Sequence, residues 1–190
     1  KLIRNKNGQL EEKVWKSGGL YGTAIDKIIY WLEKAQKVAE NKKQSDAIGL
    51  LISYYKTGDL KTWDDYNIAW LQATEGNIDY INSFIEVYND PLGYRGSYES
   101  IVQIKDFDMS KKMEVVSKNA QWFEDNSPLA PEHKKKNVVG VSYKTVVVAG
   151  ESGDSSPSTP IGVNLPNADW IRADHGSKSV SLGNIIDAYS

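Results

Sequence analysis

The spacing of apolar residues changes at Gly76, and this change constrains the fold more than any other feature of the chain. Before Gly76, apolar residues recur every three or four positions, as on one face of an amphipathic helix. The pattern predicts two helices within residues 20–58, of which the second stops at Gly58, and a third helix over 63–73.

After Gly76 the pattern is typical of strands. Residues 82–89 and 97–104 alternate polar and apolar side chains and are joined across the turn-forming sequence NDPLGYRG. Residues 137–150 are rich in β-branched side chains and give the strongest strand signal of the chain. Between these strands, residues 108–125 return to helical spacing, which predicts one inserted helix.

The remaining residues predict a loop over 151–160 and shorter strands within 161–170 and 177–186. Helices therefore come first and strands follow, instead of alternating along the chain. This order predicts an α+β fold, with a helical segment over 1–80 and a β-rich portion over 81–190.

The composition is that of a folded globular chain and excludes several classes of function. The 190 residues are 40% hydrophobic, which is enough for a core. A net charge of −2 provides no basic surface for nucleic acid, and no apolar run approaches the ~20 residues that cross a bilayer. We therefore expect neither a nucleic-acid nor a membrane partner. Cysteine is absent, so disulfides and thiolate metal sites are excluded.

The two ends of the chain predict an internal segment of a longer protein. The chain begins with Lys1 and not with methionine, and it stops inside the apolar pattern GNIIDAYS. The first residues contain no apolar stretch of the kind found in secretory signal peptides. We therefore expect the parent protein to be cytoplasmic.

Common catalytic motifs are missing from the sequence. His133 and His175 are far apart and neither belongs to a His-Glu-x-x-His motif, so we expect no metal site in this segment. Asp174, His175 and Ser177 are close in sequence, but adjacency does not encode a catalytic triad. The glycine-rich residues 16–24 lack the spacing of a phosphate-binding loop.

An ionisable pair lies in the predicted strand that ends near residue 89. Alternation places Phe84, Glu86 and Tyr88 on one face and Ile85 with Val87 on the other. If the Ile/Val face is the core, the carboxylate and the phenol share the opposite face. That face is either the wall of a cleft or a solvated sheet surface.

A second candidate lies in residues 158–170. Pro160 and Pro166 bracket a short strand, and because proline has no N–H to donate, this predicts an edge strand. A free edge can accept an extended peptide, and the amides of Asn164 and Asn167 offer both donors and acceptors. The alternative is an edge strand that ends in an Asx turn and binds nothing.

Three stretches together resemble the dipeptidyl peptidase III family, and most closely its bacterial, Bacteroides-like branch. They are FIEVYNDPLGYRGSYES, NAQWFEDNSP and PSTPIGVNLPNADWIRADHGSKSVSLGNI, and the resemblance extends over roughly residues 18–189. Members of this family are zinc exopeptidases that remove dipeptides from the N-termini of short peptides. The pairing of the first stretch with the third is specific, whereas each alone is weak.

The resemblance implies a parent enzyme with two lobes around a wide cleft. The family holds zinc in a helical lobe through a long His-Glu-x-x-x-His motif, which this sequence lacks. Its other lobe is built on a β-barrel. We therefore expect a mostly antiparallel, β-barrel-like substrate-binding portion that lies upstream of the zinc motif. Zinc would then belong to the parent enzyme, and the remaining zinc-bearing lobe would be a partner of this segment.

The resemblance also implies roles for individual residues. Glu86, with Asn164 and Asn167, matches the residues that hold the free α-amino group of the substrate. Tyr88 matches the phenol that hydrogen-bonds the scissile carbonyl as it becomes an oxyanion. The strand at Gly162 matches the edge along which the peptide lies.

Two other hypotheses remain open at this point. The chain is either a non-catalytic peptide-binding or interaction module that uses the edge strand at 159–164, or a structural piece with no ligand. Under the leading hypothesis, the isolated segment hydrolyses nothing, because it lacks the zinc ligands.

Overall fold

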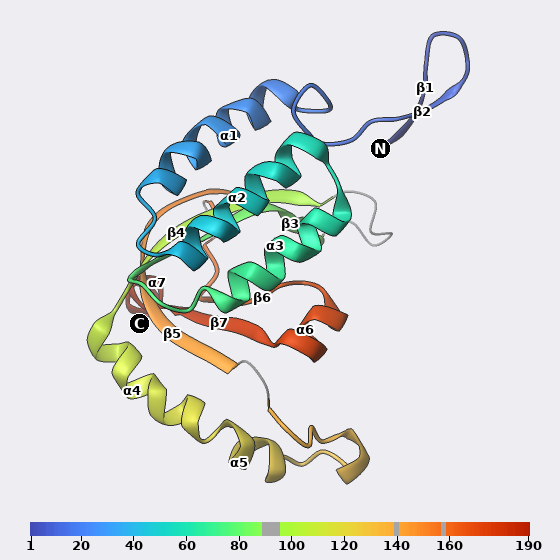
Figure 1. Cartoon of the computed structure of the whole chain (residues 1–190). Helices are drawn as coiled ribbons and strands as arrows, with labels where there is room; N and C mark the ends of the chain where they lie inside the picture. The colour runs from blue at the N-terminus through green and yellow to red at the C-terminus, as the bar shows by residue number, and fades with distance from the viewer. Residues whose placement is uncertain (89–95, 139–140, 157–158) are drawn as a thin grey trace. The chain divides into compact units, whose positions relative to one another are not determined.

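The computed structural model describes residues 1–88, 96–138, 141–156 and 159–190. They fall into two compact units, which are Lys1–Gly76 and residues 77–88 with 96–190 (Figure 1). The turn predicted between residues 89 and 96 lies almost entirely outside the described residues. Among the described helices, none is long and apolar enough to span a membrane.

The first unit contains the three helices that the apolar spacing predicts. They are α1 (Gly22–Lys37), α2 (Lys42–Thr57) and α3 (Leu60–Gln72). Many of the residues at helical spacing form its core, and Ile25, Leu51 and Tyr55 are completely buried, whereas Val38 at the end of α1 is 80% exposed. Helix α2 ends at Gly58 with a left-handed φ of 71°, as predicted. A hairpin of β1 (Leu2–Arg4) and β2 (Leu10–Glu12) precedes the helices and was not predicted.

The second unit is built on a five-stranded sheet in the order β3-β4-β5-β7-β6. Three of its ladders are antiparallel, and the ladder between β5 and β7 is parallel. The α+β class and the mostly antiparallel sheet are therefore confirmed. The strands are β3 (Ile78–Glu86), β4 (Ser97–Lys105), β5 (Val141–Gly153), β6 (Gly162–Leu165) and β7 (Ser177–Leu182).

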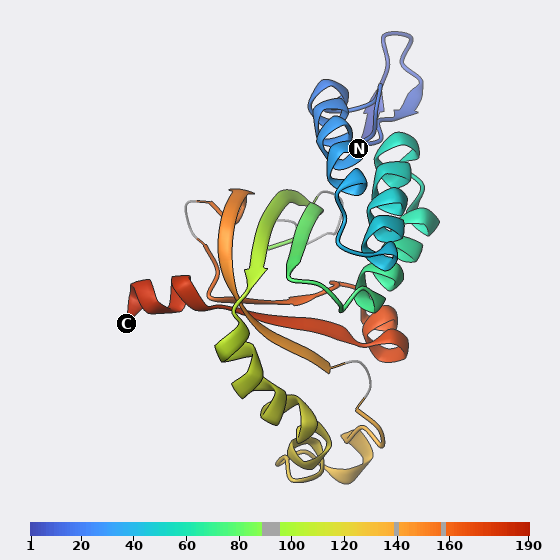
Figure 2. The same cartoon turned by 60° about the vertical axis from the view of Figure 1, so that its left-hand side comes forward.

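The sheet curls strongly without closing into a barrel (Figure 2). Strand β5 pairs with β7 through its first half and with β4 through its second half. The curl brings Lys178 Nζ on β7 within 2.8 Å of Asp79 Oδ2 on β3, although β4 and β5 separate these strands in the sheet. The expected barrel-like closure is nevertheless wrong, because β3 and β6 remain the two edges and form no ladder in the described residues. Strand β6 is only four residues long and is followed by Pro166, which has no N–H for further pairing.

The helices of the second unit differ from the prediction in number. The predicted helix over 108–125 is two helices, α4 (Phe107–Lys118) and α5 (Ala120–Asp125). The two short predicted strands are present as β6 and β7, but each is shorter than predicted. The residues after them form two helices that were not predicted, α6 (Asp169–His175) and α7 (Gly183–Tyr189). A 3₁₀ turn, η1, spans Pro131–His133, and β5 extends to Gly153 into the predicted loop. Segments this short contain too few residues for spacing to distinguish a strand from a helix.

Gly153, at the end of β5, is required by the local backbone. Its φ is +74°, and a Cβ placed there would clash with the carbonyl oxygen of Tyr98. We expect Gly153→Ala to lower the free energy of unfolding by about 2 kcal/mol or more, because both the clash and the left-handed backbone disfavour alanine. Gly150→Ala on the same strand is the control, since its Cβ would meet no atom within 4 Å. Urea unfolding followed by tryptophan fluorescence measures both; equal stabilities of the two variants would contradict this account.

Candidate functional site

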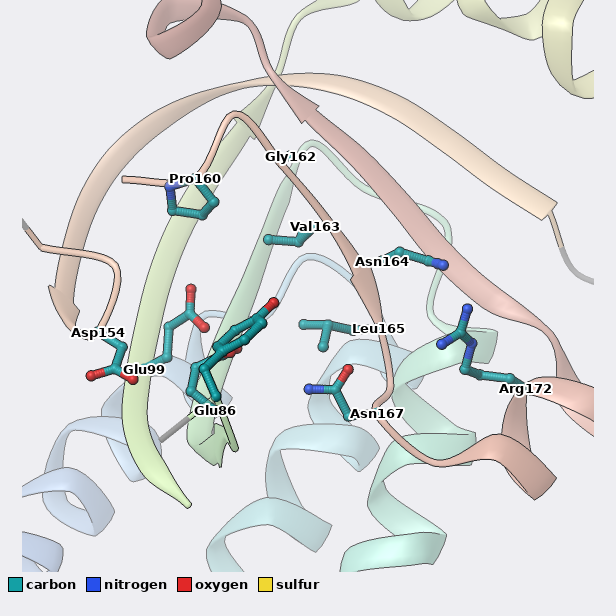
Figure 3. A pocket seen from close by; sticks show the side chains of 11 residues that line it. Glu86, Glu99, Asp154, Pro160, Gly162, Val163, Asn164, Leu165, Asn167 and Arg172 are labelled. Atoms are coloured by element: carbon teal, nitrogen blue, oxygen red, sulfur yellow. The ribbon is translucent and has the colours of Figure 1, made fainter. Parts of the chain in front are cut away.

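A cavity of about 570 Å³ opens on the second unit and contains all five predicted site residues (Figure 3). Its volume is within the usual range for small-ligand sites. The predicted Glu86, Tyr88, Gly162, Asn164 and Asn167 are joined there by six residues that were not assigned to the site. The added residues are Glu99, Asp154, Pro160, Val163, Leu165 and Arg172.

A bulge at the end of β3 turns Glu86 toward the cavity. Phe84 pairs with Tyr98 of β4, whereas Glu86 pairs with Ser97, so Ile85 is the extra residue. Because Ser97 and Tyr98 point to opposite faces of β4, Glu86 lies on the opposite face from Phe84. The expectation that Phe84 and Glu86 share a face is therefore wrong. Val87 is half exposed, so the condition that the Ile/Val face is the core is not met at this residue.

The bulge is held from the opposite wall of the cavity. Asn167, just beyond β6, donates a hydrogen bond from Nδ2 to the carbonyl oxygen of Ile85 at 3.1 Å. This bond leaves Oδ1 of Asn167 as the acceptor that remains for a ligand. Oδ1 of Asn164 accepts a hydrogen bond of 3.2 Å from the Ser179 hydroxyl on β7.

Strand β6 forms the edge of the sheet, as its two flanking prolines predict. It pairs with β7 through the residues from Gly162 to Leu165, and no strand pairs with its other side in the described residues. At Gly162 a Cβ would lie 2.9 Å from the carbonyl oxygen of Val180, so glycine permits this close approach of the two strands.

Glu99 is the most buried acid of the cavity and was missed by the sequence reasoning. It lies on β4 with only 3% of its surface exposed, and its side chain hydrogen-bonds that of Glu86. Burial raises the pKa of Glu99 to about 8, and the hydrogen bond and negative charge of Glu86 add to this effect. The signal was present in the sequence, because Glu99 alternates with Ile101 and Gln103 and so occupies a core position of its strand.

The raised pKa of Glu99 makes stability depend on pH. Between the pKa of an unfolded glutamate, ~4.3, and about 8, folded Glu99 retains a proton that the unfolded chain has lost. The free energy of unfolding should therefore fall as pH rises through this window. Glu99→Gln mimics the protonated acid, so it should be more stable than wild type at pH 9. We expect the difference in free energy of unfolding to be on the order of 2 kcal/mol, because solvent in the cavity reduces the cost of the charge.

Urea unfolding at several pH values between 5 and 9 measures this difference. The exposed Glu132→Gln is the matched control and should leave the pH dependence of wild type unchanged. A parallel pH dependence of wild type and Glu99→Gln would show that Glu99 carries no proton in the folded state.

The charges of the cavity are separated along its length. Glu86, Glu99 and Asp154 gather toward one end, and Arg172 of α6 lies near Asn164 toward the other (Figure 3). Asp154 is fixed by its backbone N–H, which donates to the carbonyl oxygen of Tyr98 at 2.9 Å. One end of the cavity therefore suits a cation.

The described residues contain no group of three or more metal-ligating side chains that could hold an ion. His133 lies in η1 and His175 ends α6, and neither lines the cavity. The described residues therefore do not provide the set of side chains that a zinc ion needs as ligands.

Comparison with known proteins then identifies the family of the chain. The sequence model of peptidase family M49 matches residues 3–190. The chain belongs to peptidase family M49. Two relatives called dipeptidyl peptidase 3, from Rattus norvegicus and Homo sapiens, are each 29% identical to it over 168 residues. These matches cover 88% of this chain but only 22% of each relative, so this M49 chain spans about a fifth of their length.

Solved structures show the same fold. The structure of DPP III from Caldithrix abyssi superposes with a TM-score of 0.83 at 24% identity, over 98% of this chain and 35% of that one. Dipeptidyl-peptidase III from Corallococcus sp. strain EGB gives a TM-score of 0.81 at 19% identity, over 98% and 34% of the two chains. The fold of this M49 segment is therefore found within larger proteins.

Proposed function

We propose that the chain forms the substrate-binding wall of a zinc-dependent dipeptidyl peptidase that releases dipeptides from the N-termini of short peptides. The observation that carries the proposal is the cavity, in which Glu86, Tyr88 and the edge strand β6 converge in a chain of a peptidase family. The names of the relatives support this substrate class.

The acidic end of the cavity supports recognition of a free amino terminus. An α-ammonium group carries a positive charge and three N–H donors, which match the carboxylate of Glu86 and the Oδ1 atoms of Asn164 and Asn167. The unpaired side of β6 offers backbone groups to an extended peptide, which would then run past Gly162.

Tyr88 is positioned to act on the bond that is cleaved. It follows Glu86 by two residues and lines the same cavity. Its hydroxyl would donate to the scissile carbonyl oxygen as negative charge develops there, which is the role of an oxyanion-hole donor. Zinc and its ligands would belong to the remaining lobe of the parent chain.

Hydrolysis by the full-length enzyme tests the proposal. We expect it to convert tetra-alanine to dialanine and to cleave N-acetyl-tetra-alanine far more slowly, because acetylation removes the positive charge that the acidic end binds. Separation of the products by mass establishes both results. Release of single alanines, or equal cleavage of the acetylated peptide, would reject dipeptide release from a free amino terminus.

The 190-residue chain by itself should hydrolyse neither peptide, with or without added zinc. Zinc-dependent turnover by the pure chain would contradict this expectation.

A second candidate function is a non-catalytic peptide-binding module, which is favoured by the unpaired edge of β6. In that case the chain alone would bind short peptides tightly, and the backbone amide signals of β6 would shift on titration. Affinity that needs the remaining lobe favours the peptidase.

A further inference from the structure

The carboxyl groups of Glu86 and Glu99 have an unusual arrangement for two acids in one cavity. Glu86 comes from the bulge of β3 and Glu99 from β4, and the bulge places both side chains on one face of the sheet, where they line the same cavity. Two carboxylates have no donor to offer each other, so two acids that face one cavity, one of them buried, favour a state in which the pair retains one proton. The raised pKa of Glu99 points in the same direction.

The surroundings of the pair keep the proton in place. Glu99 is 3% exposed, and the further acids that act on it are Asp154 and Glu151, both negative. Arg172 lines the end of the cavity away from the pair. Lys178, on the same curled sheet, is engaged by Asp79 at 2.8 Å. In the empty cavity, a second ionised carboxyl would therefore add negative charge to a region that is already acidic.

We propose that the amino terminus of the ligand replaces this shared proton, so that peptide binding at the Glu86–Glu99 pair releases a proton to solvent. The inference rests on the proposed function, since it takes the α-ammonium group as the ligand. On binding, the O–H bond of the protonated carboxyl group breaks and the proton leaves to solvent. Both carboxylates then accept hydrogen bonds from the N–H groups of the ammonium. The charge of the site is the same before and after, because one positive charge enters and one leaves.

In this exchange Glu99 binds the ammonium together with Glu86, and Glu86 alone is not sufficient. An ammonium within ~4–6 Å of a carboxyl typically lowers its pKa by 1–3 units. Because the pKa of Glu99 in the empty cavity is about 8, this lowering would release its proton in the neutral pH range, where the ammonium itself remains charged. We therefore expect a release of about 0.5 to 1 proton per peptide at pH 7.

Calorimetry of the full-length enzyme with dialanine measures this number. Titrations at pH 7 in buffers of different ionisation enthalpy give the protons released per peptide bound. Wild type should release ~0.5 to 1, Glu99→Gln close to none, and the control Glu132→Gln, in η1 away from the cavity, as many as wild type. Equal release by wild type and Glu99→Gln, or binding by wild type without release, would overturn the proposal.

Two further measurements separate this inference from the proposed function. If N-acetyl-dialanine binds as tightly as dialanine, recognition of the amino terminus fails and the proton exchange fails with it. If dialanine binds better but without proton release, only the exchange is wrong. The affinity of wild type provides a test that needs no variant, because it should rise about tenfold between pH 6 and pH 7.5 as the competing proton is lost.

Discussion

Tyr88→Phe in the full-length enzyme is expected to lower kcat by 10²- to 10³-fold while KM changes by less than about threefold. The substitution removes one hydroxyl and retains the ring. If the hydroxyl donates to the scissile carbonyl oxygen, its bond is much stronger once that oxygen carries negative charge. The loss is then felt in the transition state and hardly in the bound substrate.

Steady-state kinetics with tetra-alanine separate the two quantities. Tyr189→Phe is the matched control, because Tyr189 is also largely exposed but lies at the end of α7 and does not line the cavity. It should retain the kcat of wild type. If Tyr88→Phe raises KM and leaves kcat unchanged, Tyr88 binds substrate and takes no part in the chemical step.

The elements that the sequence predicted correctly are those determined by local patterns. The three helices of the first unit follow from apolar residues at helical spacing, and the stop at Gly58 follows from the backbone freedom of glycine. The edge position of β6 follows from Pro160 and Pro166, which cannot donate to a neighbouring strand. Each of these signals is contained in a few adjacent residues.

The bulge at Ile85 could not be predicted, because it depends on which residues of β4 face β3. Strict alternation places Glu86 with Phe84, but the extra residue moves it to the face of Glu99. The pair that results joins residues from two neighbouring strands, β3 and β4. The alternation of Glu99 with Ile101 indicated a buried acid, although only the folded sheet shows that Glu86 is its neighbour.

The curl of the sheet is also a property of distant contacts. The expected barrel required β3 to pair with β6, whereas the two edges are instead linked near the cavity by the side chain of Asn167. One hydrogen bond from a side chain replaces a ladder and leaves β6 free on one side. The same departure from closure therefore leaves the unpaired edge to which we assign the peptide.

Glu86→Gln is expected to lower kcat/KM for tetra-alanine by about 10- to 100-fold, which is the cost of replacing a charged acceptor by a neutral one. The effect should be confined to peptides with a free amino terminus, since only these carry the ammonium group. A substrate without that charge loses nothing when the carboxylate is removed. The preference for free over N-acetylated peptide should therefore decrease by a similar factor.

The ratio of kcat/KM for tetra-alanine and N-acetyl-tetra-alanine measures this preference, and Glu132→Gln is a control of the same chemistry in η1, away from the cavity. Asn167→Ala provides a contrast, because its loss also removes the hydrogen bond to Ile85 that holds the bulge. That variant should lower kcat as well as the preference, since Tyr88 follows the same bulge. If Glu86→Gln retains the full preference for a free amino terminus, the carboxylate of Glu86 is dispensable for recognition. The acidic end of the cavity would then not bind the amino terminus.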